Sequence, residues 1–137
     1  MKVFIADDSA VLRERLVEML SELPEIEITG YAQDVPETLA SLKRLNPDVV
    51  ILDIRMPGGS GIDVLQDIKK DKHIPVVIVL TNFPYPQYRK KCLGLGADYF
   101  FDKSTEFEKV PQVFKQLGGI WQRQQGSKSF WEDKTQK

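Results

Sequence analysis

Five polar residues have side chains that together suit phosphoryl transfer, and each stands closely behind an apolar run. They are Asp7, Asp8, Asp53, Thr81 and Lys103. Three carboxylates in one pocket repel one another unless a cation lies among them. Oxygen ligands alone favour Mg²⁺ over Zn²⁺, and a lysine suits a phosphate oxygen. A carboxylate nucleophile, Mg²⁺, a lysine and a hydroxyl would together form a site for phosphoryl transfer.

Each of these residues also has a simpler interpretation. Asp7 and Asp8, with the serine that follows them, could cap a helix, because Asp and Ser are good N-caps. Asp53 precedes a Pro-Gly pair and could belong to a turn, and Lys103 could be a solvated surface charge. The coincidence of all these positions at the ends of neighbouring strands would be much harder to explain by chance.

The elements that must position these residues alternate along the chain. We expect strands at 3–6, 26–29, 49–52, 76–80 and 99–101. Apolar residues at helical spacing predict helices over about 12–23, 35–45, 62–68 and 107–117, with a short helix ending near Gly94 or Gly96. The runs 49–52 and 76–80 are apolar at every position, which is typical of central parallel strands.

This alternation predicts an α/β domain with a doubly wound, five-stranded parallel sheet and the (βα)5 pattern of a flavodoxin-like fold. The strand order 2-1-3-4-5 is the leading topology. Such sheets place their working site at the carboxyl ends of the strands. Strands 1, 3, 4 and 5 would be neighbours, so the five polar side chains should converge.

Composition limits the classes of protein. The chain has 137 residues, enough for one domain, and its formal net charge of −1 gives no electrostatic reason to bind nucleic acid or anionic membrane. A single cysteine, Cys92, and a single histidine, His73, exclude an internal disulfide and Cys-rich or His-rich metal sites. The longest apolar run, 76–80, is far short of the roughly 18 residues of a membrane span. We expect a cytoplasmic protein without membrane insertion or direct DNA binding.

The ordered motifs resemble the receiver domain of bacterial response regulators, the CheY-like family, over about residues 2–117. The resemblance rests on Phe4-Ile5-Ala6-Asp7-Asp8-Ser9, on Asp48-Val49-Val50-Ile51-Leu52-Asp53-Ile54-Arg55-Met56-Pro57, on Gly61 and Thr81, and on Gly96-Ala97-Asp98 with Phe100 and Lys103. Any one of these fragments is weak evidence, but the ordered set at these spacings is highly specific.

The resemblance implies a role for each matching position. Asp53 would be the phosphoacceptor, and Thr81 and Lys103 would contact phosphoryl oxygens. Mg²⁺ would be held by Asp7, Asp8, Asp53 and the main-chain carbonyl of Arg55. Thr81 and Phe100 would form a switch that changes the surface of helix 4, strand 5 and helix 5, where a protein partner would bind. Phe100 also has the simpler interpretation of a core strand residue.

Several positions depart from the family pattern. Ser104 stands where a proline is usual, often after a cis bond. A cis bond before Ser costs about 3–4 kcal/mol, against about 0.5–1 kcal/mol before Pro, so this loop should be strained or differently shaped. Asn82 replaces a small residue and could restrict the phosphodonor. Arg55 and Phe83 are bulky at the pocket mouth, where they would hinder water, so we predict a long-lived phosphoryl group.

The end of the sequence suggests a boundary. We expect a receiver domain at 1–120 and a polar tail at 121–137, with Gly118-Gly119 interrupting the last helix. The tail carries Trp121, Phe130 and Trp131, and it is either a frayed end or a docking segment. Twenty residues after helix 5 are too few for a DNA-binding domain, so we expect a stand-alone receiver.

The sequence therefore predicts a single-domain two-component response regulator, not an enzyme beyond catalysing its own phosphorylation and dephosphorylation. A sensor histidine kinase or a phosphotransfer protein would phosphorylate Asp53, and the output would be a changed affinity for a protein partner. One alternative is a pseudo-receiver that binds partners without phosphorylation. Another is a small Mg²⁺-dependent phosphohydrolase of the haloacid dehalogenase type, but the Asp-x-Asp motif of those enzymes is missing after strand 1.

Overall fold

A computed structural model describes residues 1–126, with side chains described for residues 1–119. Five longer strands and five helices alternate along the chain, as the sequence predicted. The elements are β1 (Lys2–Ala6), α1 (Ala10–Leu20), β2 (Glu27–Ala32), α2 (Val35–Leu45), β3 (Val49–Leu52), β4 (Arg55–Met56), β5 (Gly59–Ser60), α3 (Gly61–Ile68), β6 (Val76–Thr81), α4 (Pro86–Gly94), β7 (Tyr99–Asp102) and α5 (Lys109–Gly126).

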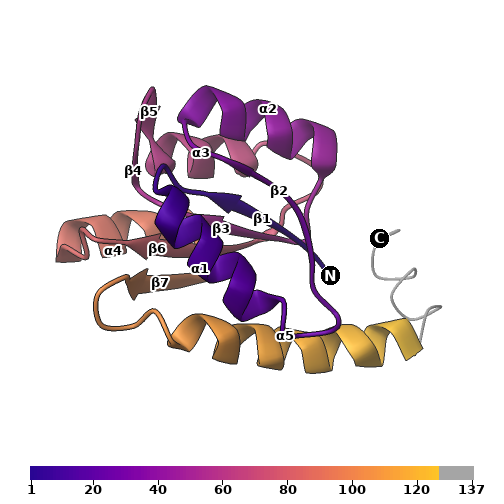
Figure 1. Cartoon of the computed structure of the whole chain (residues 1–137). Coiled ribbons are helices and arrows are strands. Elements are labelled where there is room, and N and C mark those ends of the chain that lie inside the picture. Colours follow the sequence, from indigo (N-terminus) through magenta and orange to yellow (C-terminus); the bar gives the residue numbers. More distant parts are fainter. Residues whose placement is uncertain (127–137) are drawn as a thin grey trace.

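The main sheet has the strand order β2-β1-β3-β6-β7, and every pair in it is parallel. Because β6 and β7 are the fourth and fifth long strands in the sequence, the predicted order 2-1-3-4-5 and the flavodoxin-like fold are confirmed. Figure 1 shows helices on both sides of this sheet. The short strands β4 and β5 pair as an antiparallel hairpin in a segment where the sequence predicted neither a strand nor a helix.

The core consists of two layers, one on each face of the sheet. Residues of α1 and α5 pack on one face, and residues of α2, α3 and α4 pack on the other. Successive residues of β3 belong alternately to the two layers, which explains why that strand is apolar at every position. Cys92 lies fully buried in the layer of α2, α3 and α4, and its burial raises the pKa of the thiol to about 11.

The last helix differs from the prediction. We expected Gly118-Gly119 to interrupt it, but α5 continues through both glycines to Gly126. A glycine in a helix costs only about 1 kcal/mol relative to Ala, which is not enough to end this helix. A Cβ at Gly118 would meet only the carboxylate of Glu25, a flexible side chain that can move aside.

The predicted polar tail of residues 121–137 therefore begins inside α5. Residues 127–137, with Phe130 and Trp131, lie outside the described part of the chain. Within the described part, no helix is both long enough and apolar enough to cross a membrane.

Candidate functional site

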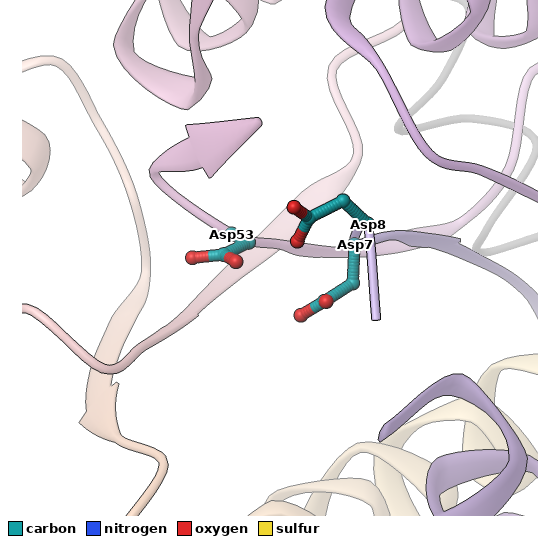
Figure 2. A group of neighbouring side chains, drawn as sticks. All are labelled: Asp7, Asp8 and Asp53. Carbon is teal, nitrogen blue, oxygen red and sulfur yellow. The ribbon is translucent and has the colours of Figure 1, made fainter. Parts of the chain in front are cut away.

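The carboxyl ends of β1, β3, β6 and β7 meet at one edge of the sheet, because these four strands are parallel neighbours. Asp7 and Asp8 follow β1, and Asp53 follows β3. One oxygen of each of these three carboxylates lies within 4.8 Å of the other two. Figure 2 shows the three side chains gathered just beyond the strand ends. The predicted convergence of the carboxylates is therefore present.

The lysine predicted for the site lies between two of the carboxylates. Lys103 Nζ is 2.7 Å from Asp7 Oδ2 and 2.9 Å from Asp53 Oδ2. Its side chain is only 8% exposed, so Lys103 is not a solvated surface charge. Asp7, Asp53 and Thr81 are buried, whereas Asp8 is exposed. The site thus has a buried, partly neutralised floor and one carboxylate open to solvent.

Burial and charge shift the ionisation of this cluster. Burial raises the pKa of Asp53, and the positive charge of Lys103 offsets only part of that effect. The negative charge of Asp7 raises the pKa of Asp53 further. Burial alone would lower the pKa of Lys103, but its hydrogen bonds to Asp7 and Asp53 and their charges outweigh burial and raise that pKa. The negative charge of the buried carboxylates therefore exceeds the positive charge of the one ammonium, and a bound cation would neutralise the remainder.

Asp7 does not serve as the helix cap that the simpler interpretation proposed. Ser9 is the N-cap of α1, and its hydroxyl accepts a hydrogen bond from Leu12 N–H at 3.2 Å. Asp7 Oδ1 accepts from Ser9 N–H at 2.8 Å, while Asp7 Oδ2 faces Lys103. Arg13, a residue that the sequence analysis missed, donates from Nη1 to the Asp7 main-chain carbonyl at 2.7 Å. These contacts fix Asp7 in place for a role in the site.

The donor set fits Mg²⁺. All three clustered ligands are carboxylates, which are hard oxygen donors. Arg55 follows Asp53 by two residues at the start of β4, and its N–H points to Asp53 Oδ1 at 3.4 Å. The segment that would supply the fourth predicted ligand, the Arg55 carbonyl, is thus adjacent to the carboxylates.

The three residues predicted at the pocket mouth are divided between two places. The guanidinium of Arg55 lies 4.0 Å from the centre of the Phe83 ring, so these side chains stack. Phe83 N–H donates to Thr81 Oγ1 at 3.0 Å, which leaves the hydroxyl proton of Thr81 available for another acceptor. Asn82 instead lines a groove of about 620 Å³ together with Lys103, Ser104 and residues of α1.

The predicted switch residue, Phe100, is 4% exposed and belongs to the core layer that contains Cys92. Its carbonyl accepts a hydrogen bond from Arg89 Nη1 at 3.1 Å, and the Arg89 guanidinium lies 5.8 Å from its ring centre. Arg89 on α4 is thus linked to β7. This position agrees with the simpler interpretation of a core residue, and the switch role stays a prediction.

Gly61 lets the chain pass directly behind Asp53. Its N–H donates to Ile54 O at 2.7 Å, and a Cβ at this position would collide with the Asp53 carbonyl oxygen. Backbone atoms cannot swing aside as a flexible side chain can, so only glycine fits here without a shift of the Asp53 backbone.

We therefore expect Gly61→Ala to lower the free energy of unfolding by about 1–3 kcal/mol, the usual cost of overpacking. The matched control is Gly94→Ala in α4, where a Cβ meets nothing within 4 Å. That change should stabilise the protein by up to about 1 kcal/mol. Urea denaturation of both variants measures the difference, and equal stabilities would show that the backbone at Gly61 is not constrained.

Comparison with known proteins identifies the family. The family model of the response regulator receiver domain matches residues 3–115. The chain belongs to this family of receiver domains. It is 30% identical over 117 residues to the DNA-binding transcriptional activator DevR/DosR of Mycobacterium tuberculosis, covering 85% of this chain and 54% of that protein. It is 32% identical over 118 residues to a protein-glutamate methylesterase/protein-glutamine glutaminase of Methanospirillum hungatei, covering 85% of this chain and 34% of that protein.

Solved receiver structures agree with this assignment. The response regulator domain of Thermotoga maritima CheB superimposes with a TM-score of 0.76 and 29% identity, covering 87% of this chain and 94% of that one. The receiver domain is a module of two-component signalling, and phosphorylation and Mg²⁺ binding are typical of its family. Because the chain spans 54% and 34% of the two curated relatives, the similarity covers their receiver part and not their whole activities.

Proposed function

We propose that Asp53 accepts a phosphoryl group from a sensor histidine kinase or a histidine phosphotransfer protein. The observation that carries the proposal is the convergence of Asp7, Asp8, Asp53 and Lys103 at one edge of a receiver fold. A carboxylate oxygen of Asp53 attacks phosphorus, the P–N bond of the phosphohistidine breaks, and the imidazole leaves with the electron pair.

The other site residues bind the metal ion and stabilise the charge on the phosphoryl oxygens. Mg²⁺, when bound, neutralises the charge that develops on the phosphoryl oxygens. Asp7, Asp8, Asp53 and the Arg55 carbonyl hold the ion. Lys103 places an ammonium against the developing charge. The Thr81 hydroxyl, whose lone pair already accepts from Phe83 N–H, donates its proton to a phosphoryl oxygen.

The output is a changed affinity for a protein partner. Thr81 and Phe100 form the switch, and the partner binds the face built by α4, β7 and α5. A phosphoryl group on Asp53 adds negative charge that attracts the free proton of the Thr81 hydroxyl, and the same hydroxyl accepts from Phe83 N–H in the loop that leads into α4. A protein target is favoured over DNA because the formal net charge is −1.

The test is the intact mass of the protein after incubation with acetyl phosphate, with and without Mg²⁺. We expect one added phosphoryl group in the presence of Mg²⁺ and none after chelation of the metal. Purified phosphorylated histidine kinase domains serve as the second donor, because acetyl phosphate tests a small donor only. Absence of an adduct with every donor would favour the pseudo-receiver alternative, in which the domain binds partners without phosphorylation.

The stack of Arg55 on Phe83 leads to a prediction about the lifetime of the phosphoryl group. The two side chains lie in contact, and the main-chain N–H of Arg55 is 3.4 Å from Asp53 Oδ1, so in this proposal the stack obstructs an attacking water. We expect Phe83→Ala and Arg55→Ala each to accelerate loss of the phosphoryl group about three- to tenfold, which corresponds to about 0.7–1.4 kcal/mol in the barrier. The measurement is a decay time course after removal of the phosphodonor.

The control variant for this prediction is Ile74→Ala. Ile74 is an exposed apolar residue that precedes β6 at the opposite end of the sheet. The phosphoryl group of Ile74→Ala should have the same lifetime as that of the wild type. If Phe83→Ala and Arg55→Ala also leave the lifetime unchanged, the stack does not protect the phosphoryl group.

A further inference from the structure

The loop that carries Lys103 is closed by hydrogen bonds between its two ends. Asp102 N–H donates to Glu106 Oε1 at 3.1 Å, and Glu106 N–H donates to Asp102 O at 2.8 Å. Ser104 N–H donates to Asp102 Oδ1 at 2.8 Å. We call these three bonds the Asp102–Glu106 clasp. Since every described peptide bond is trans, the loop differs in shape from one with the cis bond common in the family.

Lys103 lies inside this clasp and is the first residue after β7. Its own N–H donates to Thr81 O at 2.9 Å, which ties its backbone to the end of β6. Its side chain reaches Asp7 and Asp53 and is almost fully buried. The clasp therefore joins the residues before and after Lys103, and the bond to Thr81 restrains the backbone of Lys103 itself.

Glu106 is itself held in the orientation that the clasp needs. Its Oε2 pairs with Lys109 Nζ at 2.8 Å, one turn further along the chain. The hydrogen bond from Lys109 lowers the pKa of the Glu106 carboxyl, which is ionised at neutral pH. Glu106 thus uses one oxygen for Asp102 and the other for Lys109.

The backbone of this loop needs another restraint because Ser104, unlike a proline, does not have a fixed φ angle. Ordering one residue costs about 1–2 kcal/mol in backbone entropy. A proline would supply a fixed φ but would have no N–H to donate. Ser104 has an N–H, and Asp102 Oδ1 accepts a hydrogen bond from it. The hydrogen bonds of the clasp thus restrain the backbone that a proline ring would otherwise restrain.

We propose that Asp102 and Glu106 are positioning residues that hold Lys103 at the acidic site. Within the described part of the chain, neither side chain forms a hydrogen bond or ion pair with Asp7, Asp8 or Asp53, so both act through Lys103. The proposal rests on the proposed function in so far as Lys103 promotes the phosphorylation of Asp53.

The test compares Glu106→Ala with the matched variant Glu106→Gln. Gln keeps an oxygen that accepts from Asp102 N–H, whereas Ala removes it. We expect Glu106→Ala to slow phosphorylation by acetyl phosphate about tenfold and Glu106→Gln to stay within about twofold of the wild type, a difference of about 1 kcal/mol. Asp102→Ala and Asp102→Asn form a second pair with the same expectation, because Asn keeps an acceptor for Ser104 N–H.

A double-mutant cycle separates positioning from general destabilisation. In a Lys103→Ala background, Glu106→Ala should slow phosphorylation no further, because the residue that it positions is already gone. Additive effects of the two changes would overturn the proposal. A fall in Mg²⁺ affinity of Glu106→Ala, measured by calorimetry, would also overturn it, since that would indicate damage to the carboxylates themselves.

Hydrogen exchange of the Lys103 amide tests the clasp without phosphorylation. We expect this amide to exchange at least about tenfold faster in Glu106→Ala than in Glu106→Gln. The reason is that Ala removes the bond from Asp102 N–H, so the residues before and after Lys103 are joined less firmly. Equal exchange would refute the clasp. If no donor phosphorylates the wild type, the proposed function fails, and the exchange experiment still decides whether the clasp positions Lys103.

Discussion

Replacement of Asp53 by Asn will abolish uptake of a phosphoryl group from acetyl phosphate, lowering the rate by more than about 1,000-fold at every Mg²⁺ concentration. Of the two buried carboxylates, Asp53 has the oxygen with the longer and weaker polar contact. Both oxygens of Asp7 accept short bonds, one from Ser9 N–H and one from Lys103. Among the described residues, the one hydrogen bond that Asp53 Oδ1 accepts is the 3.4 Å contact with Arg55 N–H, so it is the oxygen available for attack.

The matched control for this prediction is Asp8→Asn. Asp8 is exposed and, among the described residues, forms no ion pair with Lys103, so its proposed role is to hold the metal. Loss of a ligand weakens metal binding but keeps the nucleophile. We therefore expect raised Mg²⁺ to restore phosphorylation of Asp8→Asn and to leave Asp53→Asn inactive. Equal rescue of both variants would show that Asp53 is not the phosphoacceptor.

The sequence could predict the fold because the strands that form the site carry two signals, an apolar run and a polar residue directly after it. The strand β3 is apolar at every position, which requires helices on both faces, and a carboxylate follows it at once. The same pattern of a buried strand and a polar residue recurs at β1 and β6. Since parallel strands place their carboxyl ends at one edge, the convergence of Asp7, Asp53 and Thr81 followed from the strand order alone.

Contacts between loops could not be predicted in the same way. Arg55 and Phe83 are 28 residues apart, and no periodicity in the sequence pairs them. Asp102 ends β7, and its bonds to Glu106 close a loop whose sequence has no apolar periodicity, so the departure at Ser104 predicted a different loop but not how it closes. The prediction at Gly118-Gly119 was wrong because it rested on local propensity alone, and α5 continues through both glycines.

The position of Lys103 has a consequence for metal binding. Its single ammonium, at 2.7 Å from Asp7 and 2.9 Å from Asp53, already neutralises part of their charge, and both are proposed Mg²⁺ ligands. The lysine and the ion therefore compete for charge on the same carboxylates. An ion that binds here must repel or displace the ammonium, which would free it to contact a phosphoryl oxygen. Lys103 should thus oppose metal binding and favour phosphoryl transfer.

Lys103→Ala should separate these two effects. We expect the phosphorylation rate to fall about 100- to 1,000-fold, as when one donor to a developing anion is removed. We expect Mg²⁺ affinity, measured by calorimetry, to rise about tenfold, because a positive charge beside the carboxylates is lost. The control is Lys90→Ala on the exposed surface of α4, which removes the same charge from a lysine that forms no ion pair with the described carboxylates and should change neither quantity. A lower Mg²⁺ affinity in Lys103→Ala would instead mean that the lysine holds the carboxylates in place for the metal rather than competing with it.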